Sequence, residues 1–276
     1  MKSTVNKNIL KIRLSYFFLP VLLLMAVFGF LFYSRALLHS EYIELQKELF
    51  LYGNAELSVY PVLMDNLTQL GDALILLSFL TILFVIAPKC WECFINALLI
   101  SALFTAILKP LFAIPRPAAF LQEKFTIIGP KLVGSNSFPS GHSITVFTIL
   151  GVILFAFMPQ RIILKILWCL FICVLGAILI STRIGVGAHY PLDVLVGSIF
   201  GYLSALIGIV VTQKFNLWTW IDKVKLYPIF MLLFTVSTVI IIFKILDTNL
   251  FIFYLALFSL LISLFVITRI YVQKKY

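Results

Sequence analysis

Long apolar stretches, separated by short polar connections, follow one another along almost the whole chain. A helix needs about 20 apolar residues to cross the roughly 30 Å hydrocarbon core of a bilayer. We expect eight membrane-spanning helices, at Leu14–Ser34, Leu67–Ala87, Cys93–Lys109, Ser143–Met158, Ile162–Ser181, Pro191–Val211, Tyr227–Leu246 and Leu250–Ile267. The pattern predicts an all-α fold, a polytopic transmembrane helical bundle.

The composition agrees with a membrane protein. Hydrophobic residues make up 62% of the 276 positions and charged residues only 12%, whereas about 25% of a soluble domain is charged. The sequence contains no internal repeat and no low-complexity tract. The first apolar stretch is too long and too aromatic for a cleaved signal peptide. We therefore expect a single membrane region.

The net charge of +10 would favour nucleic-acid binding in a soluble protein, but here the positions of the charges matter more. If the N-terminus is cytoplasmic, thirteen of the twenty-one Lys and Arg residues fall in cytoplasmic segments, and nine of the eleven acidic residues fall outside. Basic residues concentrate on the cytoplasmic side of membrane proteins. We expect both termini to be cytoplasmic and no nucleic-acid partner.

Three polar clusters stand at the ends of apolar stretches, where polar side chains are costly and therefore informative. They contain, in chain order, Lys109 and Arg116, then Ser140, Gly141 and His142, then Arg183, His189 and Asp193. With a cytoplasmic N-terminus, all three clusters fall on the outer face of the membrane. We expect them to form one site.

The residue types in these clusters suit a phosphate group. Lys109 supplies a point charge, and the guanidinium groups of Arg116 and Arg183 can each hold two phosphate oxygens. Ser140 offers a hydroxyl, and Gly141 lets backbone N–H groups approach an anion closely. The sequence therefore predicts a phosphate site.

Two of the three histidines of the chain fall within the clusters. His189 and Asp193 are one helical turn apart, so the carboxylate can accept from one ring nitrogen and leave the other free to attack. An oriented histidine beside cations indicates phosphoryl transfer through a phosphohistidine. His142 would protonate the leaving oxygen. Ser140 is not expected to be a nucleophile, because it is not set in a G-x-S-x-G motif.

In order, the motifs Lys109-x6-Arg116-Pro117, Pro139-Ser140-Gly141-His142 and Thr182-Arg183-x5-His189-x3-Asp193 closely resemble the three-part signature of the type-2 phosphatidic acid phosphatases. Those proteins are metal-independent membrane lipid phosphatases, so the resemblance implies no metal and no cofactor. It also implies catalytic roles for His189, Asp193 and His142, and phosphate binding by Lys109, Arg116, Ser140, Gly141 and Arg183. Thr182 stands where the family often has Ser, and it keeps the hydroxyl.

The resemblance covers about residues 67–211, with the first span as the sixth helix of the core. We expect a phosphatase-like membrane domain at 1–212 and two additional transmembrane helices at 213–276, which the signature does not explain. The implied partner is a lipid phosphate in the bilayer of a bacterial inner membrane. Undecaprenyl pyrophosphate is the leading candidate, with lipid A, phosphatidylglycerol phosphate and phosphatidic acid as alternatives.

Several features allow more than one interpretation. A phosphotransferase, or a non-enzymatic transporter that binds phospholipid head groups, would need similar cations. The pair Cys90 and Cys93 has metal-ligand or redox spacing, but it falls at an expected cytoplasmic turn with no histidine on that side, which favours reduced, structural thiols. Asp72 is either a helix cap or a head-group contact. Residues 41–53 could form an amphipathic helix on the outer surface, or an ordinary connector.

Overall fold

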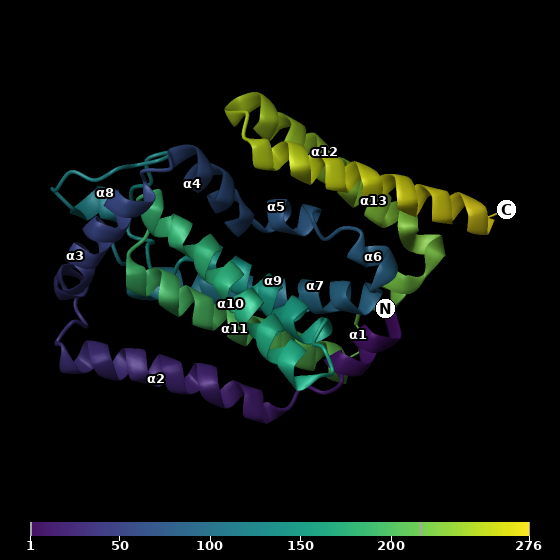
Figure 1. Ribbon diagram of the computed structural model, residues 1–276, viewed down its shortest axis with the longest axis horizontal. Coiled ribbons are helices and arrows are strands. Elements are labelled where there is room, and N and C mark those ends of the chain that lie inside the picture. Colours follow the sequence, from purple (N-terminus) through teal and green to yellow (C-terminus); the bar gives the residue numbers. More distant parts are fainter. Residues whose placement is uncertain (1, 216, 276) are drawn as a thin grey trace.

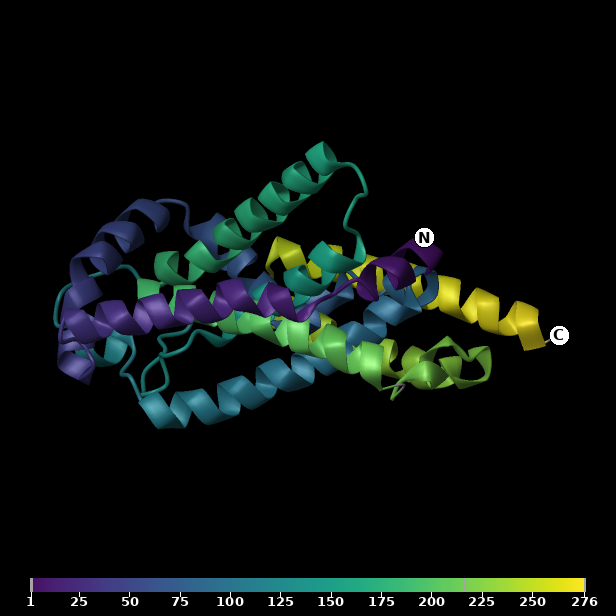
Figure 2. The same cartoon turned by 90° about the horizontal axis from the view of Figure 1, so that it is seen from below.

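The computed structural model describes residues 2–215 and 217–275, which form helices and connecting loops without strands. The bundle is elongated, and both termini lie at the same end (Figures 1 and 2). The helices are, in chain order, α1 (Lys2–Ile9), η1 (Leu14–Phe17), α2 (Phe18–Tyr33), α3 (His39–Leu57), α4 (Pro61–Thr68), η2 (Gln69–Gly71), α5 (Ala73–Ser78), α6 (Leu83–Ile86), α7 (Pro88–Phe112), α8 (Pro117–Phe120), α9 (Gly141–Ala156), α10 (Ile162–Gly185), α11 (Pro191–Lys214), η3 (Thr219–Asp222), η4 (Val224–Leu226), α12 (Tyr227–Thr248) and α13 (Phe251–Lys275).

The membrane character predicted from the apolar pattern is confirmed. Within the described residues, six helical stretches are long and apolar enough to cross a membrane: Leu14–Tyr33, Pro88–Phe120, Ile162–Gly185, Pro191–Lys214, Val224–Thr248 and Phe251–Lys274. They correspond to six of the eight predicted spans. Helix α9 covers the predicted fourth span with 16 residues, and it packs against α7, α10 and α11 in the middle of the bundle.

The second predicted span, Leu67–Ala87, is not one continuous helix, and that prediction was wrong. The chain passes instead through the end of α4, then η2, α5 and α6. The Asp72 carboxylate accepts from the N–H of Leu74 at 2.8 Å, and the hydroxyls of Ser78 and Thr81 donate to the carbonyls of Leu74 and Ser78. Such local bonds compete with a regular helical ladder, and an apolar pattern does not reveal them.

The centre of the bundle is the packing of α11 against α9 and α7. Gly201 of α11 lies against the backbone of Ile144 in α9, and Gly208 lies against Ala97 in α7. Small residues let membrane helices approach closely, which strengthens their van der Waals contact. This packing fixes the start of α11 beside the start of α9, which brings Asp193 of the third cluster next to the second cluster.

The two C-terminal helices form a hairpin that docks on the α4–α6 segment, while α2 runs along the opposite side of the bundle (Figure 1). The N–H of Ile252 in α13 donates to Oδ1 of Asn66 in α4 at 2.9 Å. The hydroxyls of Thr81 and Ser263 are 2.7 Å apart in a buried contact. These hydrogen bonds fasten the hairpin to the irregular segment, and Phe234 of α12 also packs against Trp91 of α7.

The close approach of α11 to α7 predicts a large effect of a side chain at Gly208. An added Cβ would lie 2.5 Å from the Cα of Ala97, so Gly208→Val should lower the free energy of unfolding by about 1–3 kcal/mol through overpacking. Gly29→Val is the matched control, because nothing lies within 4 Å of a Cβ added at Gly29. Thermal unfolding in detergent tests this, and equal melting temperatures for the two variants would contradict it.

Candidate active site

The first cluster is held in place by Asn136. Lys109 stands in the last turn of α7, which ends in a left-handed Ala113, and its Nζ donates to the Asn136 carbonyl at 3.1 Å. Nε of Arg116 donates to Oδ1 of the same asparagine at 2.6 Å. The N–H of Ser137 donates to the Ile114 carbonyl at 2.9 Å, which folds the loop back over the helix end. One loop residue thus positions both cations.

The second cluster begins α9. Ser140 is the N-cap of this helix: its Oγ accepts from the N–H of Ser143 at 3.4 Å, and its own N–H donates to the Asp193 carbonyl at 3.0 Å. An added Cβ on Gly141 would lie 3.9 Å from Nζ of Lys109. The second cluster is therefore in contact with both the first and the third.

The third cluster forms the turn between α10 and α11. The N–H of His189 donates to the Arg183 carbonyl at 3.2 Å, and Gly187 takes the positive φ of 74° that the turn requires. Asp193 lies in the first turn of α11 and accepts from the N–H of Tyr190 at 3.0 Å. This bond holds the Asp193 carboxylate at the start of α11, next to the His189 ring.

The link between His189 and Asp193 differs from the direct hydrogen bond that their spacing suggests. Nδ1 of His189 lies 3.6 Å from Oδ2 of Asp193. The Ser137 hydroxyl donates to that same Oδ2 at 2.5 Å and lies 3.4 Å from Nδ1. Ser137 can thus accept from the Nδ1–H and relay the bond to the carboxylate. The other ring nitrogen, Nε2, faces NH1 of Arg116 at 3.4 Å.

His189 is buried, with 1% of its surface exposed. Burial, and then the nearby charges of Arg116, Arg183 and Lys109, hold the pKa of His189 well below its usual value of 6.5. The imidazole is therefore neutral near pH 7, and a neutral imidazole has the free electron pair that a nucleophile needs.

Arg183 is almost completely buried, and its Nε is a buried donor. Its NH1 donates to Oγ1 of Thr68 at 2.6 Å, while its Nε has no hydrogen-bond partner among the described residues. Buried polar groups are normally satisfied. Arg183 also lines a polar pocket.

That polar pocket has a volume of about 250 Å³ and is lined by Thr68, Asp72, His142, Arg183 and other residues. His142 stands in the first turn of α9, and its ring is packed against Gly71, where an added Cβ would lie 2.6 Å from the His142 Cβ. The structure thus brings together all eight residues of the predicted site. Their individual roles stay predictions.

Helix α3 contributes residues that the sequence interpretation missed. Segment 41–53 is part of a helix and not an ordinary connector, but one face of it is buried rather than lying on the surface, with Tyr42, Gln46, Phe50 and Asn54 at every fourth position. The Tyr42 hydroxyl donates to Oδ1 of Asp193 at 2.7 Å. The spacing of this stripe was the available signal.

The same helix fastens the two ends of the histidine turn. Oε1 of Gln46 accepts from the N–H of Leu192 at 2.8 Å. Nδ2 of Asn54 donates to the carbonyls of Ile184 and Gly185 at 3.0 and 3.1 Å. Helix α3 therefore clamps the turn that carries His189 from both sides.

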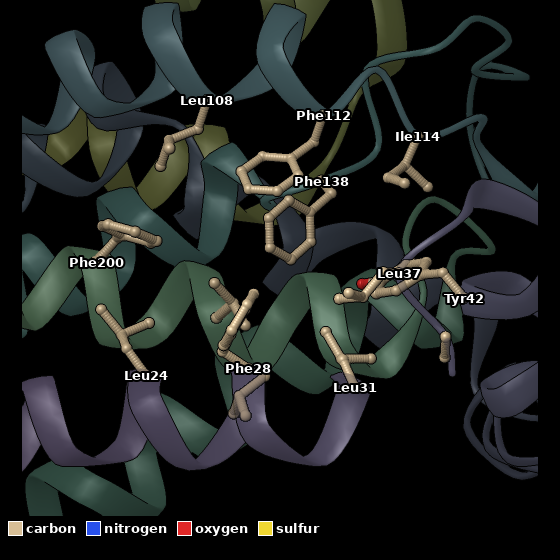
Figure 3. Close-up of a pocket in the computed structure, with 13 residues that line it drawn as sticks. Leu24, Phe28, Leu31, Leu37, Tyr42, Leu108, Phe112, Ile114, Phe138 and Phe200 are labelled. Carbon is tan, nitrogen blue, oxygen red and sulfur yellow. The ribbon is translucent and has the colours of Figure 1, made fainter. Parts of the chain in front are cut away.

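An apolar pocket of about 250 Å³ lies on the α2 side of the site, between α2, α7 and α11 (Figure 3). Phe112, Phe138 and Leu31 are among its lining residues, and Tyr42 presents its ring to the pocket while its hydroxyl reaches Asp193. The pocket shares no lining residue with the polar pocket at His142. Asp193 is thus screened on this side by apolar side chains.

The cysteine pair plays no part in this geometry. Cys90 and Cys93 are buried and free in α7, far along the helix from Lys109. Within the described ranges, no group of three or more His, Cys, Asp and Glu side chains is arranged to hold a metal ion.

The fold and the site define a polytopic membrane protein with a buried, cation-rich histidine site at one end of its bundle. Residues 91–217 match the family described as the PAP2 superfamily, so the chain is similar to that superfamily over this segment.

Two known proteins are similar to this chain. The protein named bacitracin transport permease protein BcrC, from Bacillus licheniformis, is 36% identical over 110 residues, which are 40% of this chain and 49% of that protein. The match therefore spans about half the length of the curated relative. The crystal structure of Aquifex aeolicus LpxE superposes with a TM-score of 0.50 at 27% identity, covering 62% of this chain and 96% of that one.

The bond from Tyr42 to Asp193 predicts a stability effect specific to this tyrosine. Tyr42→Phe leaves one oxygen of a buried carboxylate without a donor, which should cost about 1–3 kcal/mol of unfolding free energy. Tyr52→Phe is the control, because Tyr52 is on the same helix but 67% exposed. Thermal unfolding of both variants in detergent measures the difference. Equal stability of the two proteins would rule out a supporting role for the bond.

The lowered pKa of His189 predicts a pH dependence of stability. As pH falls below about 6.5, the unfolded chain takes up a proton on His189 that the folded chain refuses, so stability is lost at up to about 1.4 kcal/mol per pH unit. His189→Gln removes this contribution. The difference in unfolding free energy between wild type and variant, followed from pH 7.5 to 5, should therefore shrink towards acid. A constant difference would show that His189 titrates normally.

Proposed function

We propose that the protein is an integral membrane lipid phosphatase that removes a phosphate from a lipid phosphate or pyrophosphate through a phosphohistidine intermediate. The setting of His189 carries the proposal. Its Nε2 faces Arg116, its Nδ1 is directed at the Ser137–Asp193 pair, and burial keeps the ring neutral. A neutral imidazole with one nitrogen fixed and the other facing cations suits attack on phosphorus.

In the first step of the proposed reaction, Nε2 of His189 attacks the phosphorus and the bond to the lipid oxygen breaks. With the substrate anion bound and offsetting the neighbouring cations, His142 carries a proton and gives it to that oxygen, so the lipid leaves as an alcohol or a lower phosphate. In the second step water attacks the phosphohistidine, returns a proton to His142 and releases inorganic phosphate. The charge on the phosphate oxygens is balanced by Lys109, Arg116 and Arg183, with further contacts from Ser140 and the N–H of Gly141.

A lipid substrate is supported by the position of the site. It lies at one end of a bundle whose helices cross a membrane, so a head group can enter while its chains stay in the bilayer. Undecaprenyl pyrophosphate is the leading candidate, because recycling of carrier lipids is a common outer-face task in the family that the motifs resemble. Lipid A, phosphatidylglycerol phosphate and phosphatidic acid are the alternatives.

The proposed location is a bacterial inner membrane with both termini in the cytoplasm and the site facing the periplasm. The termini lie at one end of the bundle, and helices α3 and α8 lie at the other (Figures 1 and 2), as an even number of crossings requires. The charge distribution of the sequence then selects the orientation. Residues 1–212 would form the catalytic domain, and 213–276 would add the hairpin.

The test is phosphate release from these four lipids by purified protein in detergent with EDTA present, wild type beside His189→Ala. Wild type should release phosphate without added metal, and the variant should lose at least about a thousandfold in rate, as nucleophile removal does elsewhere. With ³²P-labelled substrate, acid-labile label should remain on the wild-type protein after denaturation and be absent from His189→Ala.

Several results would contradict the proposal or refine it. A requirement for metal, or label on a residue other than His189, would rule out this mechanism. Label that appears on an acceptor lipid rather than as free phosphate would identify a phosphotransferase that uses the same histidine.

Transport is a second candidate, because the Bacillus licheniformis relative is named a transport permease. The cations would then bind a phosphate head group without cleaving it. Movement of a lipid phosphate across proteoliposome membranes by the His189→Ala variant, with no phosphate release by wild type, would favour it.

A further inference from the structure

The C-terminal hairpin contributes a cation to the polar pocket at His142. The pocket wall consists mainly of the α4–η2 segment, the end of α10 and the loop around 127–132, but it also includes Lys244 from α12. Lys244 is the residue through which the hairpin reaches this pocket. The two helices that the family signature does not explain are therefore in contact with its predicted active site.

Lys244 has neighbours that define its position, but its ammonium group makes no close ion pair. Its Nζ lies 3.7 Å from Oδ2 of Asp72 and 5.6 Å from the centre of the Phe253 ring. The side chain remains 34% exposed, and the ion pair is longer than a close charge-assisted bond. Asp72 stays in place through its other oxygen, which caps α5 at Leu74. Lys244 thus keeps the capacity to bind another anionic group.

The hairpin is docked on the segment that also holds the catalytic side chains. Asn66 binds the start of α13, Thr68 binds Arg183, and Gly71 packs against His142. These contacts lie within six consecutive positions of the chain, so the hairpin and the catalytic groups share one support. Lys244 has a fixed place relative to His142 for that reason.

We propose that Lys244 binds an anionic group attached to the leaving oxygen, namely the inner phosphate of a lipid diphosphate. The inference rests on the proposed function, in which His142 protonates the leaving oxygen. Whatever is bonded to that oxygen must lie beside His142, in the pocket that Lys244 lines. The hairpin thereby makes the site selective for diphosphates over monophosphates.

The charges of the pocket are compatible with this ligand. Its lining carries two cations, Arg183 and Lys244, and two carboxylates, Asp65 and Asp72. Asp72 is paired with Lys244, and Oδ1 of Asp65 accepts from Gln69. The positive and negative charges of the lining therefore balance. An added phosphate would be attracted by the two cations. A neutral hydroxylated head group would gain less from Lys244.

The experiment compares kcat/KM for undecaprenyl diphosphate and undecaprenyl monophosphate, which share one chain. Lys244→Gln should lower the value for the diphosphate about tenfold, a loss of roughly 1.4 kcal/mol, and change the monophosphate less than about twofold. Lys244→Arg should retain the preference. Lys225→Gln is the matched control, since Lys225 is exposed just before α12.

Asp72→Asn separates substrate binding from a structural role. If Lys244 binds the inner phosphate itself, this variant keeps the diphosphate preference, because the lysine remains. If the ion pair merely supports the fold, Asp72→Asn reproduces the effect of Lys244→Gln, and the inference is wrong.

The other possible results of these assays also test the proposed role of Lys244. Lys244 does not bind the inner phosphate if Lys244→Gln lowers kcat/KM equally for both substrates, or for neither. The same holds if the loss is confined to lipid monophosphates whose head groups carry hydroxyls. In each of these cases the proposed function still stands. A wild type inactive on both lipids, and on the wider panel, would overturn the proposed function and this inference together.

Discussion

The buried Asp193 is the residue on which the arrangement of the site depends. A carboxylate out of water is costly unless its oxygens receive donors, and here the donors come from distant segments. Ser137 binds one oxygen from the loop before α9, Tyr42 binds the other from α3, and the Asp193 carbonyl accepts from Ser140. Satisfying one residue therefore requires α3, the loop and α11 to meet, and that requirement places His189 among the cations.

The cations themselves are held by neutral groups rather than by carboxylates. Lys109 donates to a backbone carbonyl, Arg116 to a carbonyl and an amide, and Arg183 to a hydroxyl. In the described part of the chain, no salt bridge includes any of the three. Neutral acceptors fix a cation without cancelling its field, so the positive potential stays available to an anion, and it also disfavours protonation of His189.

The sequence predicted the membrane bundle and the convergence of the three clusters, because chain hydrophobicity and motif spacing are local properties. It did not reveal that Ser137 stands between His189 and Asp193, since helical spacing gives reach but not the competing donors. The role of α3 was also missed: its buried stripe is half polar, with Gln46 and Asn54 facing inward, and therefore resembles a surface helix. These features depend on tertiary contacts that a single chain pattern does not encode.

The break in the predicted second span also depends on tertiary contacts. Irregular backbone at membrane depth persists only where protein covers it or where it lines a cavity, and the α4–α6 segment meets both conditions. Thr68, Gln69 and Asp72, near its beginning, line the polar pocket. Further along, the hairpin covers the segment through the contact of Ser263 with Thr81. A regular helix here would keep its backbone N–H and C=O groups in its own ladder. At the break the Asp72 carboxylate instead caps α5 and lies near Lys244, and the Thr68 hydroxyl just before it accepts from Arg183. The departure from helical order therefore lies beside the groups proposed to bind the ligand.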